Sequence, residues 1–443
     1  IAVGDVNRDG LDDLYLGGAK EQAGILLLQT FSGDFEEVSN PIFQQLAKAE
    51  DTVAEFADFN GDGHLDLFVG SGGNEHPKGA LFNFDRIFFG DGTGKFQFDM
   101  RAIPPIGENT SCIAIHDVDG DGDLDIFVGA SVVTGDYGAS PSSHLLINQG
   151  KGQFTDGTEL WFGGNIDLGM INSAVFADLE GDGKKELIFS GDWNGLRTFR
   201  KSGNSLEEFT PKGLEFAAGW IQTIRVADVN RDGKMDILTG NLGENTKLKA
   251  NSERPVWLYH HDFDRNGQAD PVVFHYMRDK LVPFATRDDL IRQIPGVKRK
   301  HSDYSSYAKI SRPEDLFTEE ELKGVRKLPA YDFRSGAYLQ QMDGSFEFLP
   351  FPANAQWGPI FALEWDEENQ ILYLGGNSTD FRVDLGKSRN LGVEKIQFNV
   401  GSWEGMGSYS TDLQNIRHIR QIKSPDQNRI LVVPNDTRPF FLR

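Results

Sequence analysis

The sequence is poor in cysteine, in long apolar runs and in basic residues, and each shortage excludes a class of protein. Its one cysteine, Cys112, rules out an internal disulfide bond. No run of 18 apolar residues occurs, so the sequence predicts no membrane-spanning helix. Lys and Arg number 44 against 67 Asp and Glu, and the net charge of −23 argues against nucleic acid as a partner. No signal peptide is visible, and because Ile1 begins inside a strand-like run we expect a leader to precede it.

Glycine and phenylalanine are abundant instead. The chain of 443 residues holds 50 Gly and 33 Phe. Phenylalanine favours strands and glycine favours tight turns, so the composition predicts many short strands joined by turns. Charged residues at 25% and hydrophobic residues at 39% are typical of a folded globular protein.

An acidic motif, Asp-x-[Asp/Asn/Glu]-x-[Asp/Asn]-Gly-x-x-[Asp/Glu], occurs six times. Oxygen side chains at positions 1, 3, 5 and 9, a backbone carbonyl at position 7 and a turn-forming Gly at position 6 are what a calcium ion needs. The motif matches the first part of an EF-hand loop, but the twelfth-position Glu is missing: Leu16 and Val69 stand there in the first two copies. Strand-like runs flank the copies. The sequence therefore predicts calcium loops that join strands rather than helices.

The six loops are not equivalent. The first, second, third and fifth have the best ligand sets, whereas the fourth has Glu180 and Glu186 where the pattern favours Asp, and the sixth stands in a different frame. We therefore expect four to six calcium ions, with a structural role. The predicted ligands, position 7 acting through its carbonyl, are Asp5, Asn7, Asp9, Leu11 and Asp13; Asp58, Asn60, Asp62, His64 and Asp66; Asp117, Asp119, Asp121, Asp123 and Asp125; Asp178, Glu180, Asp182, Lys184 and Glu186; Asp228, Asn230, Asp232, Lys234 and Asp236; and Asp262, Asp264, Asn266, Gln268 and Asp270.

A wider frame of strand, loop, strand and glycine surrounds five of the loops. The glycine stands twelve residues after the first Asp, or one further in the fourth unit. Two later segments keep the frame but lack the ligands, and we expect them to form hairpins without metal: Ile360–Glu364 with Ile371–Gly375, and Ile416–Lys423 with Arg429–Val433. The frame glycines of the five loops are Gly17, Gly70, Gly129, Gly191 and Gly240.

The spacing of these units predicts the architecture. The units start at residues 5, 58, 117, 178, 228, 363 and 422, which are 50 to 61 residues apart except for one gap of 135. A four-stranded propeller blade takes about 40–50 residues plus loops. Seven units predict an all-β fold, a seven-bladed β-propeller that spans residues 1–443 as one domain.

The sixth loop, at Asp262, breaks this frame. It follows Asp228 by only 34 residues, and we interpret it as an extra hairpin loop inside the fifth blade. The alternative is an eight-bladed ring in which Asp262 opens a blade of its own. A partly helical insertion is predicted over residues 271–329, with helices at Arg287–Ile294, Arg312–Phe317 and Thr318–Leu322. Such an insertion either caps the ring or docks a partner, or else packs on the blades as a solvated loop.

The loops followed by Leu-Phe-Val-Gly or Ile-Phe-Val-Gly resemble FG-GAP repeats, also called VCBS-type repeats, as in the integrin α-subunit propeller. More narrowly, Ala2–Asn7, Gly240–Lys249, Pro283–Leu290 and the Tyr304-x-x-Tyr307-Ala308 motif resemble the C-terminal propeller of large surface proteins of Bacteroidota, which are similar to cartilage-acidic-protein and UnbV-type proteins. This resemblance implies a bacterial cell-surface protein that accompanies an outer-membrane nutrient-uptake system.

Two classes of function are consistent with these features. The first is a non-catalytic binding or scaffold module whose partner is an outer-membrane protein or a glycan. The second is a calcium-dependent lectin, or a polysaccharide lyase or hydrolase that uses His76, His260, His261 or Tyr276 as a base. Binding is expected on the face opposite the metal loops, where Trp beside Asn and acidic groups suits a sugar or peptide, although the Trp residues also suit packing between blades. The predicted ligand-binding residues are Asn74, Glu75, Trp193, Trp220, Asn241, Trp357 and Arg382.

Overall fold

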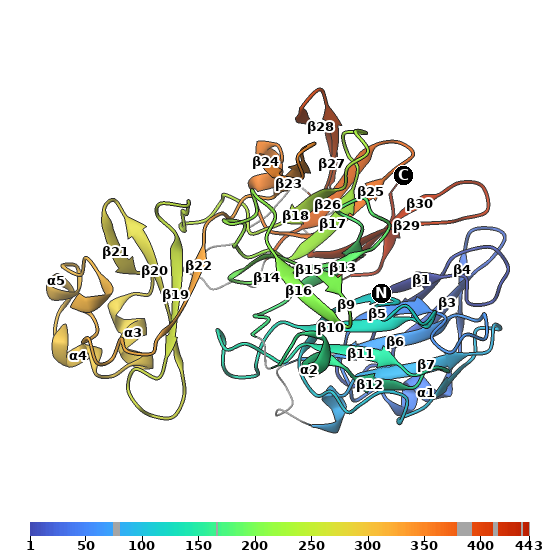
Figure 1. The fold of residues 1–443 in the computed structure, drawn as a ribbon, viewed down its shortest axis with the longest axis horizontal. Helices are drawn as coiled ribbons and strands as arrows, with labels where there is room; N and C mark the ends of the chain where they lie inside the picture. The colour runs from blue at the N-terminus through green and yellow to red at the C-terminus, as the bar shows by residue number, and fades with distance from the viewer. Residues whose placement is uncertain (74–79, 165–166, 379–391, 411–414, 436, 443) are drawn as a thin grey trace.

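The protein is an all-β molecule made of antiparallel sheets (Figure 1). The computed structural model describes residues 1–443 except 74–79, 165–166, 379–391, 411–414, 436 and 443. These residues form eight sheets, seven with four strands and one with three. Within the described part of the chain, no helix combines the length and apolar character needed to cross a membrane.

Seven of the sheets follow a common plan, in which the first two strands form a hairpin and the later strands are added to one side. The bounds are β1 Ala2–Gly4, β2 Asp13–Leu16, β3 Ile25–Gln29, β4 Phe35–Val38; β5 Asp51–Ala57, β6 Asp66–Ser71, β7 Arg86–Gly90, β8 Phe96–Phe98; β9 Thr110–His116, β10 Asp125–Ala130, β11 His144–Asn148, β12 Phe154–Asp156; β13 Ser173–Ala177, β14 Glu186–Gly191, β15 Asn194–Ser202, β16 Ser205–Phe209; β17 Thr223–Ala227, β18 Asp236–Gly240, β23 Gly336–Gln340, β24 Phe346–Pro350; β25 Ile360–Asp366, β26 Ile371–Gly376, β27 Gly392–Asn399, β28 Ser402–Ser410; and β29 Ile416–Ile422, β30 Arg429–Pro434, β31 Phe440–Phe441.

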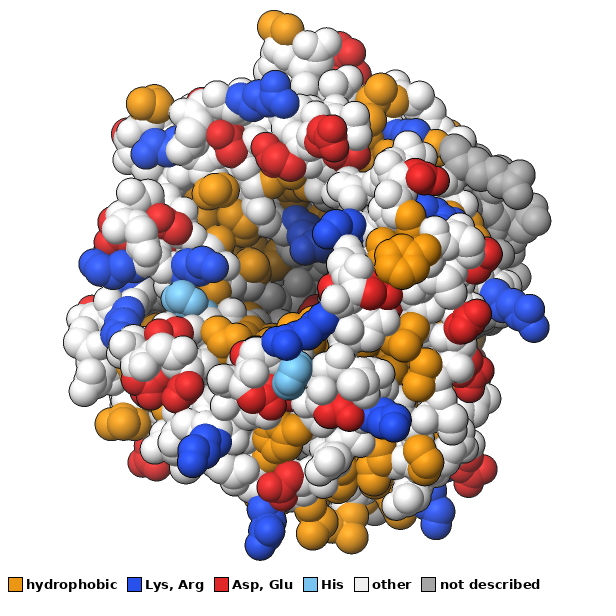
Figure 2. All heavy atoms as spheres, turned by 90° about the vertical axis from the view of Figure 1, so that its right-hand side faces the viewer, with side chains coloured by type: hydrophobic (Ala, Val, Ile, Leu, Met, Phe, Trp, Pro, Cys, Tyr) orange, Lys and Arg blue, Asp and Glu red, His pale blue; other side chains and the backbone are white. Residues whose placement is uncertain are grey.

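The first strands of these seven sheets stand around a common axis. Each touches the next in the order β1, β5, β9, β13, β17, β25 and β29. Ile1 and Leu14 pack against Ile422 and Leu431, which joins the seventh sheet to the first. Residues on or beside all seven strands line a cavity of about 690 Å³. The hollow at the centre of the round face in Figure 2 has Lys and Arg side chains around it. The sheets therefore form a β-propeller with an axial cavity.

Amide side chains on third strands tie neighbouring sheets together. Asn148 on β11 donates through Nδ2 to the Phe59 carbonyl, 2.8 Å away in the second acidic loop. Gln340 on β23 makes the same bond to Leu179 in the fourth loop at 2.9 Å. In the hairpin β29–β30, which lacks metal ligands, Lys423 occupies the equivalent position and accepts from Gln29 Nε2 at 2.9 Å. The hydrogen bond between sheets is thus retained where the ligand residues are lost.

The frame glycines stand where neighbouring sheets come too close for a side chain. A Cβ atom on Gly70 would lie 2.5 Å from Thr110 Cγ2 of the next sheet. On Gly240 it would lie 2.5 Å from the Ile360 carbonyl oxygen, which is backbone and cannot rotate away. The glycine twelve residues after the loop Asp is therefore set by the approach of the next first strand.

The eighth sheet is inserted within the fifth, between β18 and β23, and projects from the ring at the left of Figure 1. Its strand order is β21-β20-β19-β22, and its apolar core includes Phe274, Leu290 and Phe317. The Asp262 loop joins β19 to β20, so it belongs to a sheet of its own rather than to an extra hairpin of the fifth sheet. The inserted sheet begins before residue 271, the predicted start of the insertion, and ends within one residue of its predicted end at residue 329. Its strands are β19 Val256–His261, β20 Asp270–Met277, β21 Lys280–Pro283 and β22 Arg326–Ala330.

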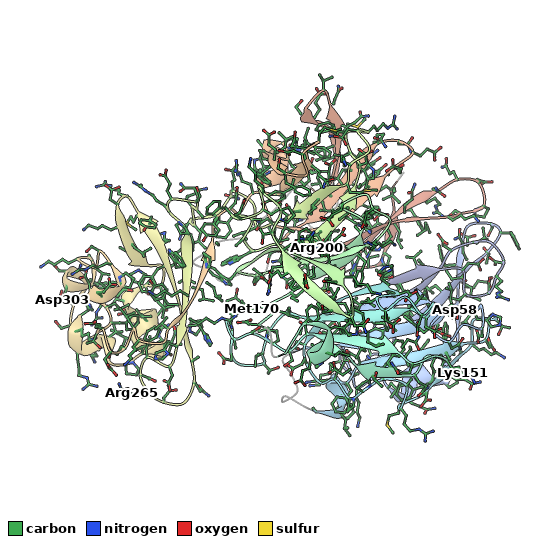
Figure 3. All side chains as sticks on the ribbon, viewed as in Figure 1. Asp58, Lys151, Met170, Arg200, Arg265 and Asp303 are labelled. Carbon is green, nitrogen blue, oxygen red and sulfur yellow. The ribbon has the colours of Figure 1, made fainter. Side chains whose placement is uncertain are left out.

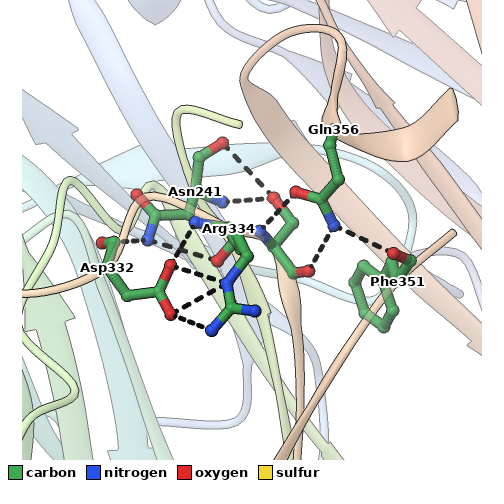
Figure 4. A network of polar contacts seen from close by, with 6 residues as sticks. Asn241, Asp332, Arg334, Phe351 and Gln356 are labelled. Carbon is green, nitrogen blue, oxygen red and sulfur yellow. Dashed lines mark hydrogen bonds and ion pairs between the residues drawn. The ribbon is translucent and has the colours of Figure 1, made fainter. Parts of the chain in front are cut away.

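A polar network clamps the two ends of this insertion where they leave and re-enter the ring (Figure 4). The Asn241 amide nitrogen Nδ2 donates to the carbonyl oxygens of Asp332 and Arg334 at 3.1 and 3.4 Å. Ser335 Oγ accepts from the Asn241 backbone N–H at 2.9 Å, and Gln356 bonds both backbone groups of Ser335. The clamp holds the insertion at a fixed base because its polar groups are buried and bonded to backbone.

The predicted helices are partly confirmed. Arg287–Gln293 forms α3, with Thr286 as its N-cap. Pro313–Asp315 forms only a 3-10 turn, and Thr318–Leu322 does not form a helix. The capping bonds between Thr318 and Glu321 are nevertheless present at 2.7 and 3.3 Å, so the local signal operates, but the chain turns away at Gly324, whose φ is 78°. Other helices are α1 Pro41–Gln45, α2 Thr158–Trp161, α4 Val297–Lys300 and α5 Tyr304–Tyr307.

Candidate functional site

The six acidic loops share one backbone shape. Position 4 adopts the left-handed conformation in every loop, with φ between 59° and 87°, and the position 6 glycine has φ between 82° and 98°. The two conformations together fold the loop back on itself, and glycine accommodates the second without strain. The out-of-frame loop at Asp262 has the same shape, with Arg265 at φ 61° and Gly267 at φ 90°. The motif therefore dictates the loop conformation wherever it occurs in the fold.

Side-chain oxygens are held inside each loop by its own amide groups. The carboxylate at position 1 accepts from the position 6 glycine N–H at 2.8 to 3.0 Å in all six loops. The side chain at position 5 accepts from the N–H of position 7 at 2.8 to 2.9 Å. These bonds orient the oxygens before any ion is bound, which lowers the entropy that ion binding must overcome.

The closing carboxylate at position 9 is buried and ties the loop to the sheet. In each loop it accepts from the N–H of position 2 at 2.7 to 3.1 Å. In the first, second, third and fifth loops its other oxygen accepts from a third-strand amide at 2.8 to 2.9 Å. Burial raises the pKa of the Asp13, Asp66 and Asp125 carboxyl groups to about 6 and that of Asp236 to about 7.

Two loops bring three carboxylates close together. Oxygens of Asp117, Asp119 and Asp125 all lie within 4.8 Å of one another. The same holds for Asp262, Asp264 and Asp270 (Figure 3 marks the nearby Arg265). An all-oxygen donor set of this kind fits calcium. The clustered negative charge is unfavourable without a counter-ion, and a divalent cation would remove that repulsion.

In the fourth loop, carboxylates at the predicted ligand positions form ion pairs with basic side chains. Glu180 forms an ion pair with Arg200 at 3.1 Å, and Asp182 forms one with Lys184 at 3.1 Å. Both partners supply positive charge to carboxylates that a metal would otherwise balance. These basic side chains thus supply part of the positive charge that a bound metal ion would supply in the fourth loop.

The raised pKa values of the closing carboxylates predict an unusual pH dependence for the metal-free protein. Between about pH 4 and pH 7 the folded state holds protons on Asp13, Asp66, Asp125 and Asp236 that the unfolded state has lost, so stability falls as pH rises through this window. We expect the free energy of unfolding of metal-stripped protein, measured in urea, to be higher at pH 5 than at pH 7.5. The variant Asp236→Asn, which cannot titrate at that position, should show a smaller decline; a rise in stability from pH 5 to 7.5 in both proteins would contradict this prediction.

The opposite ends of the sheets carry Trp193, just after β14, and Trp220, just before β17, which are two of the residues predicted to bind a ligand. Asp58 lies on the side of the ring away from the inserted sheet, whereas Met170 lies on the side facing it (Figure 3). Trp193 is 4% exposed, and its Nε1 donates to the Tyr137 hydroxyl at 2.9 Å. Trp220 packs edge-on against Trp193 with ring centroids 5.4 Å apart. The two Trp residues therefore pack against each other and against residues of the insertion, as in the alternative interpretation of these residues as packing groups.

Of the other predicted ligand-binding residues, Asn241 lies beside Trp220 and accepts its backbone N–H through Oδ1 at 3.0 Å. Asn241 is buried and belongs to the clamp at the base of the insertion. Trp357 is 46% exposed, and its carbonyl accepts from Asn245 Nδ2 at 3.2 Å. Asn74, Glu75, His76 and Arg382 lie outside the described residues.

The sequence analysis missed a carboxylate beside these aromatic residues. Asp192 directly follows the frame glycine Gly191 and accepts three hydrogen bonds at 2.9 Å, from Tyr137 Oη, Asn172 Nδ2 and Gln222 Nε2. Burial raises its pKa. The sequence did contain a signal for this carboxylate. A charged residue follows the frame glycine of the fourth unit, whereas Gly, Ser and Ala follow it in the first three units.

Polar contacts hold the inserted sheet against the ring. His260 Nε2 lies 2.6 Å from Asp136 Oδ1 in the loop after β10, and Arg326 pairs with Asp167 at 2.7 Å. His261 packs edge-on against Phe263. His260, considered as a base from the sequence, is therefore paired with a carboxylate at the junction between sheet and ring.

Comparisons with known proteins agree with the repeat pattern. The family described as FG-GAP-like repeat matches residues 5–69, 58–128 and 178–239. Phosphatidylinositol-glycan-specific phospholipase D of Rattus norvegicus is 28% identical over 152 residues, and that of Mus musculus is 28% identical over 150 residues. Each match covers 31% of this chain and 18% of the relative, so the chain spans under a fifth of the length of these relatives.

Two solved structures are similar over most of the chain at low identity. One is an Agrocybe aegerita lectin described as recognising non-reducing terminal N-acetylglucosamine, with a TM-score of 0.48, 13% identity, and coverage of 97% of this chain and 89% of the lectin. The other is the Dos1 propeller, with a TM-score of 0.30, 9% identity, and coverage of 97% and 64%.

Proposed function

We propose that this β-propeller with FG-GAP-like repeats is a calcium-stabilised binding or scaffold module without catalytic activity. The observation that carries the proposal is that all six acidic loops have one conformation with their oxygens already oriented. We infer four to six calcium ions per chain, in the first, second, third and fifth loops and in part or all of the other two.

We also propose that the ring contains seven blades. Seven first strands surround the axial cavity in succession, and the eighth sheet lies outside that ring and is inserted into the fifth. The eight-bladed alternative would require β19 to stand between β17 and β25, yet β17 and β25 are in direct contact.

Calcium would act on the whole ring through the loops. Each ion would neutralise a carboxylate cluster and fix the hairpin between the first two strands. The closing carboxylate accepts a hydrogen bond from the backbone of the third strand. In three sheets, the amide side chain of that same third-strand residue donates to the neighbouring sheet, so an ordered loop also stabilises the contact between sheets. Open loop sites of this kind need calcium at about 10⁻⁴–10⁻³ M, the range of extracellular modules. We therefore propose an extracellular location. From the resemblance to Bacteroidota surface proteins, we also propose a bacterial cell-surface role as accessory to an outer-membrane nutrient-uptake complex.

Loop variants separate the strong sites from the weak one. Asp117→Asn removes a converging carboxylate of the third loop, whereas Asp178→Asn makes the same change at position 1 of the fourth loop, where cations already pair with Glu180 and Asp182. We expect calcium to stabilise the Asp117→Asn protein less than wild type by about 1 kcal/mol, and the Asp178→Asn protein almost as much as wild type, measured by urea unfolding with and without calcium. Equal losses in the two variants would contradict the ranking of the loops.

Binding is tested with a panel of plant and microbial glycans and with a solubilised outer-membrane fraction. Retention of a transporter, or of a glycan without turnover, supports a binding module, and Trp357→Ala on the expected binding face should weaken it. Met342→Ala, which changes a side chain 81% exposed in the β23–β24 turn, is the control. New reducing ends or unsaturated sugar products would instead establish the lyase or hydrolase alternative and overturn the non-catalytic role.

A further inference from the structure

A second cavity, of about 460 Å³, lies between the ring and the inserted sheet. The ring contributes Trp220, Gln222 and Phe361 to its lining, and the inserted sheet contributes Leu258 and Val273, with Phe284 just after β21. Its volume falls in the range of small-molecule sites, about 300–1,000 Å³. Because both units supply walls, the cavity exists only when the insertion is seated on the ring.

The lining is mainly apolar, and its polar side chains are Tyr137, Asp192, Trp220 and Gln222. Among the residues that the structure describes, Asp192 is the only acidic residue lining the cavity, and no Lys, Arg or His lines it. Arg197 and Arg326, which line a neighbouring pocket with Asp192, pair instead with Glu208 and Asp167. The negative charge of Asp192 thus has no cationic partner in the lining.

The hydrogen bonds around Asp192 favour its ionised form. Asn172 and Gln222 donate amide N–H groups to Oδ1, and the Tyr137 hydroxyl approaches Oδ2. Trp193 Nε1 donates to that same hydroxyl, which leaves the Tyr137 proton to be donated to Asp192. Three neutral donors stabilise a carboxylate but supply no opposite charge, and an unpaired charge away from bulk water is costly.

We propose that this cavity binds an organic cation, namely an ammonium group carried on an apolar or aromatic body. The ammonium would pair with Asp192, and the rings of Trp220, Phe284 and Phe361 would contact the apolar body and offer their faces to the positive charge. Anionic ligands would meet the Asp192 carboxylate, and a free sugar would leave its hydroxyl groups unpaired against the apolar walls. This inference rests on the proposed binding role and names a ligand class for it.

The test uses 2-phenylethylammonium as the probe, with 2-phenylethanol, 3-phenylpropanoate and N-acetylglucosamine as neutral, anionic and sugar counterparts. Titration calorimetry of the whole chain with calcium should show binding of the ammonium at least tenfold tighter than that of any counterpart. Asp192→Asn, similar in size but uncharged, should weaken ammonium binding at least tenfold and leave 2-phenylethanol unchanged. Asp343→Asn, an exposed carboxylate in the β23–β24 turn, is the matched control and should bind as wild type.

A second variant keeps the test independent of the folding of Asp192→Asn. Val273→Phe fills part of the cavity from β20 and should abolish ammonium binding while the calcium-induced rise in melting temperature persists. Equal affinity for the charged and neutral probes, or unchanged ammonium binding by folded Asp192→Asn or Val273→Phe, would overturn the ligand class. If wild type binds none of the probes yet still retains a glycan or transporter, this inference fails while the proposed function stands.

Discussion

Calcium at about 2 mM should raise the melting temperature of the chelated protein by about 3–8 °C. With dissociation constants of about 10⁻⁴–10⁻³ M, each occupied loop stabilises the folded state by about 0.7–1.8 kcal/mol. Four strong loops then contribute about 3–7 kcal/mol, which corresponds to several degrees in a protein of this size. Differential scanning calorimetry of chelated protein with and without added calcium measures the shift.

Magnesium at the same concentration is the control for this result. Magnesium retains its water and prefers a small octahedral shell, so it should give a much smaller shift. The pH measurement on metal-free protein provides a second check, because calcium stabilises the ionised closing carboxylates and should reduce the loss of stability between pH 5 and pH 7.5. Identical melting curves with chelator, magnesium and calcium would exclude a structural metal.

Replacing Gly240 with valine should destabilise the protein by about 3 kcal/mol or more. A Cβ atom at this position would lie 2.5 Å from the Ile360 carbonyl oxygen and 2.7 Å from Thr223 Cγ2. Relief requires the fifth and sixth sheets to separate, and overpacking that forces side-chain and backbone shifts typically costs about 1–3 kcal/mol and occasionally more. Urea unfolding in saturating calcium isolates this effect from metal binding.

Gly405→Val is the matched control for the glycine prediction. Gly405 also lies in a strand, β28, and a Cβ atom there would meet nothing within 4 Å. Its substitution should change the free energy of unfolding by no more than about 0.5 kcal/mol. Similar losses from both variants would show that general strand effects, rather than the approach of neighbouring sheets, explain the frame glycines.

Local patterns were enough to predict the loops and the hairpins. The order of oxygens and glycine predicted one loop shape six times, because that shape depends on bonds within nine residues, such as Asp5 to Gly10. The frame glycine recurred twelve residues on in four units and thirteen residues on in the fourth. The sequence could not show why a glycine is needed there. The atom closest to a Cβ at Gly240 is the carbonyl oxygen of Ile360, 120 residues further along the chain.

The local sequence pattern did not predict that the Asp262 hairpin belongs to a separate, inserted sheet. The Asp262 loop has the same motif and conformation as the others, yet its strands pair with β21 and β22 outside the ring. The motif determines a hairpin but not the sheet that the hairpin joins, which depends on strand partners as distant as Ala330, which pairs with Val256. For the same reason the capping residues Thr318 and Glu321 formed their bonds without a helix.

The candidate binding face was predicted only in outline. Trp193, Trp220 and Asn241 do lie on the side opposite the metal loops, as the position of the frame glycines indicated. Their burial could not be predicted, because it results from the inserted sheet seating on the ring and from the clamp at Ser335. The cavity at Asp192 is missed for the same reason: residues from the third to the sixth sheets and from the insertion meet there.

The number of calcium ions bound per chain tests the central claim most directly. Equilibrium dialysis in millimolar calcium, followed by elemental analysis, should find four to six ions per wild-type chain. Asp117→Asn, which breaks the carboxylate cluster of the third loop, should bind one fewer. A folded chain that retains no calcium above the dialysis buffer would contradict the account.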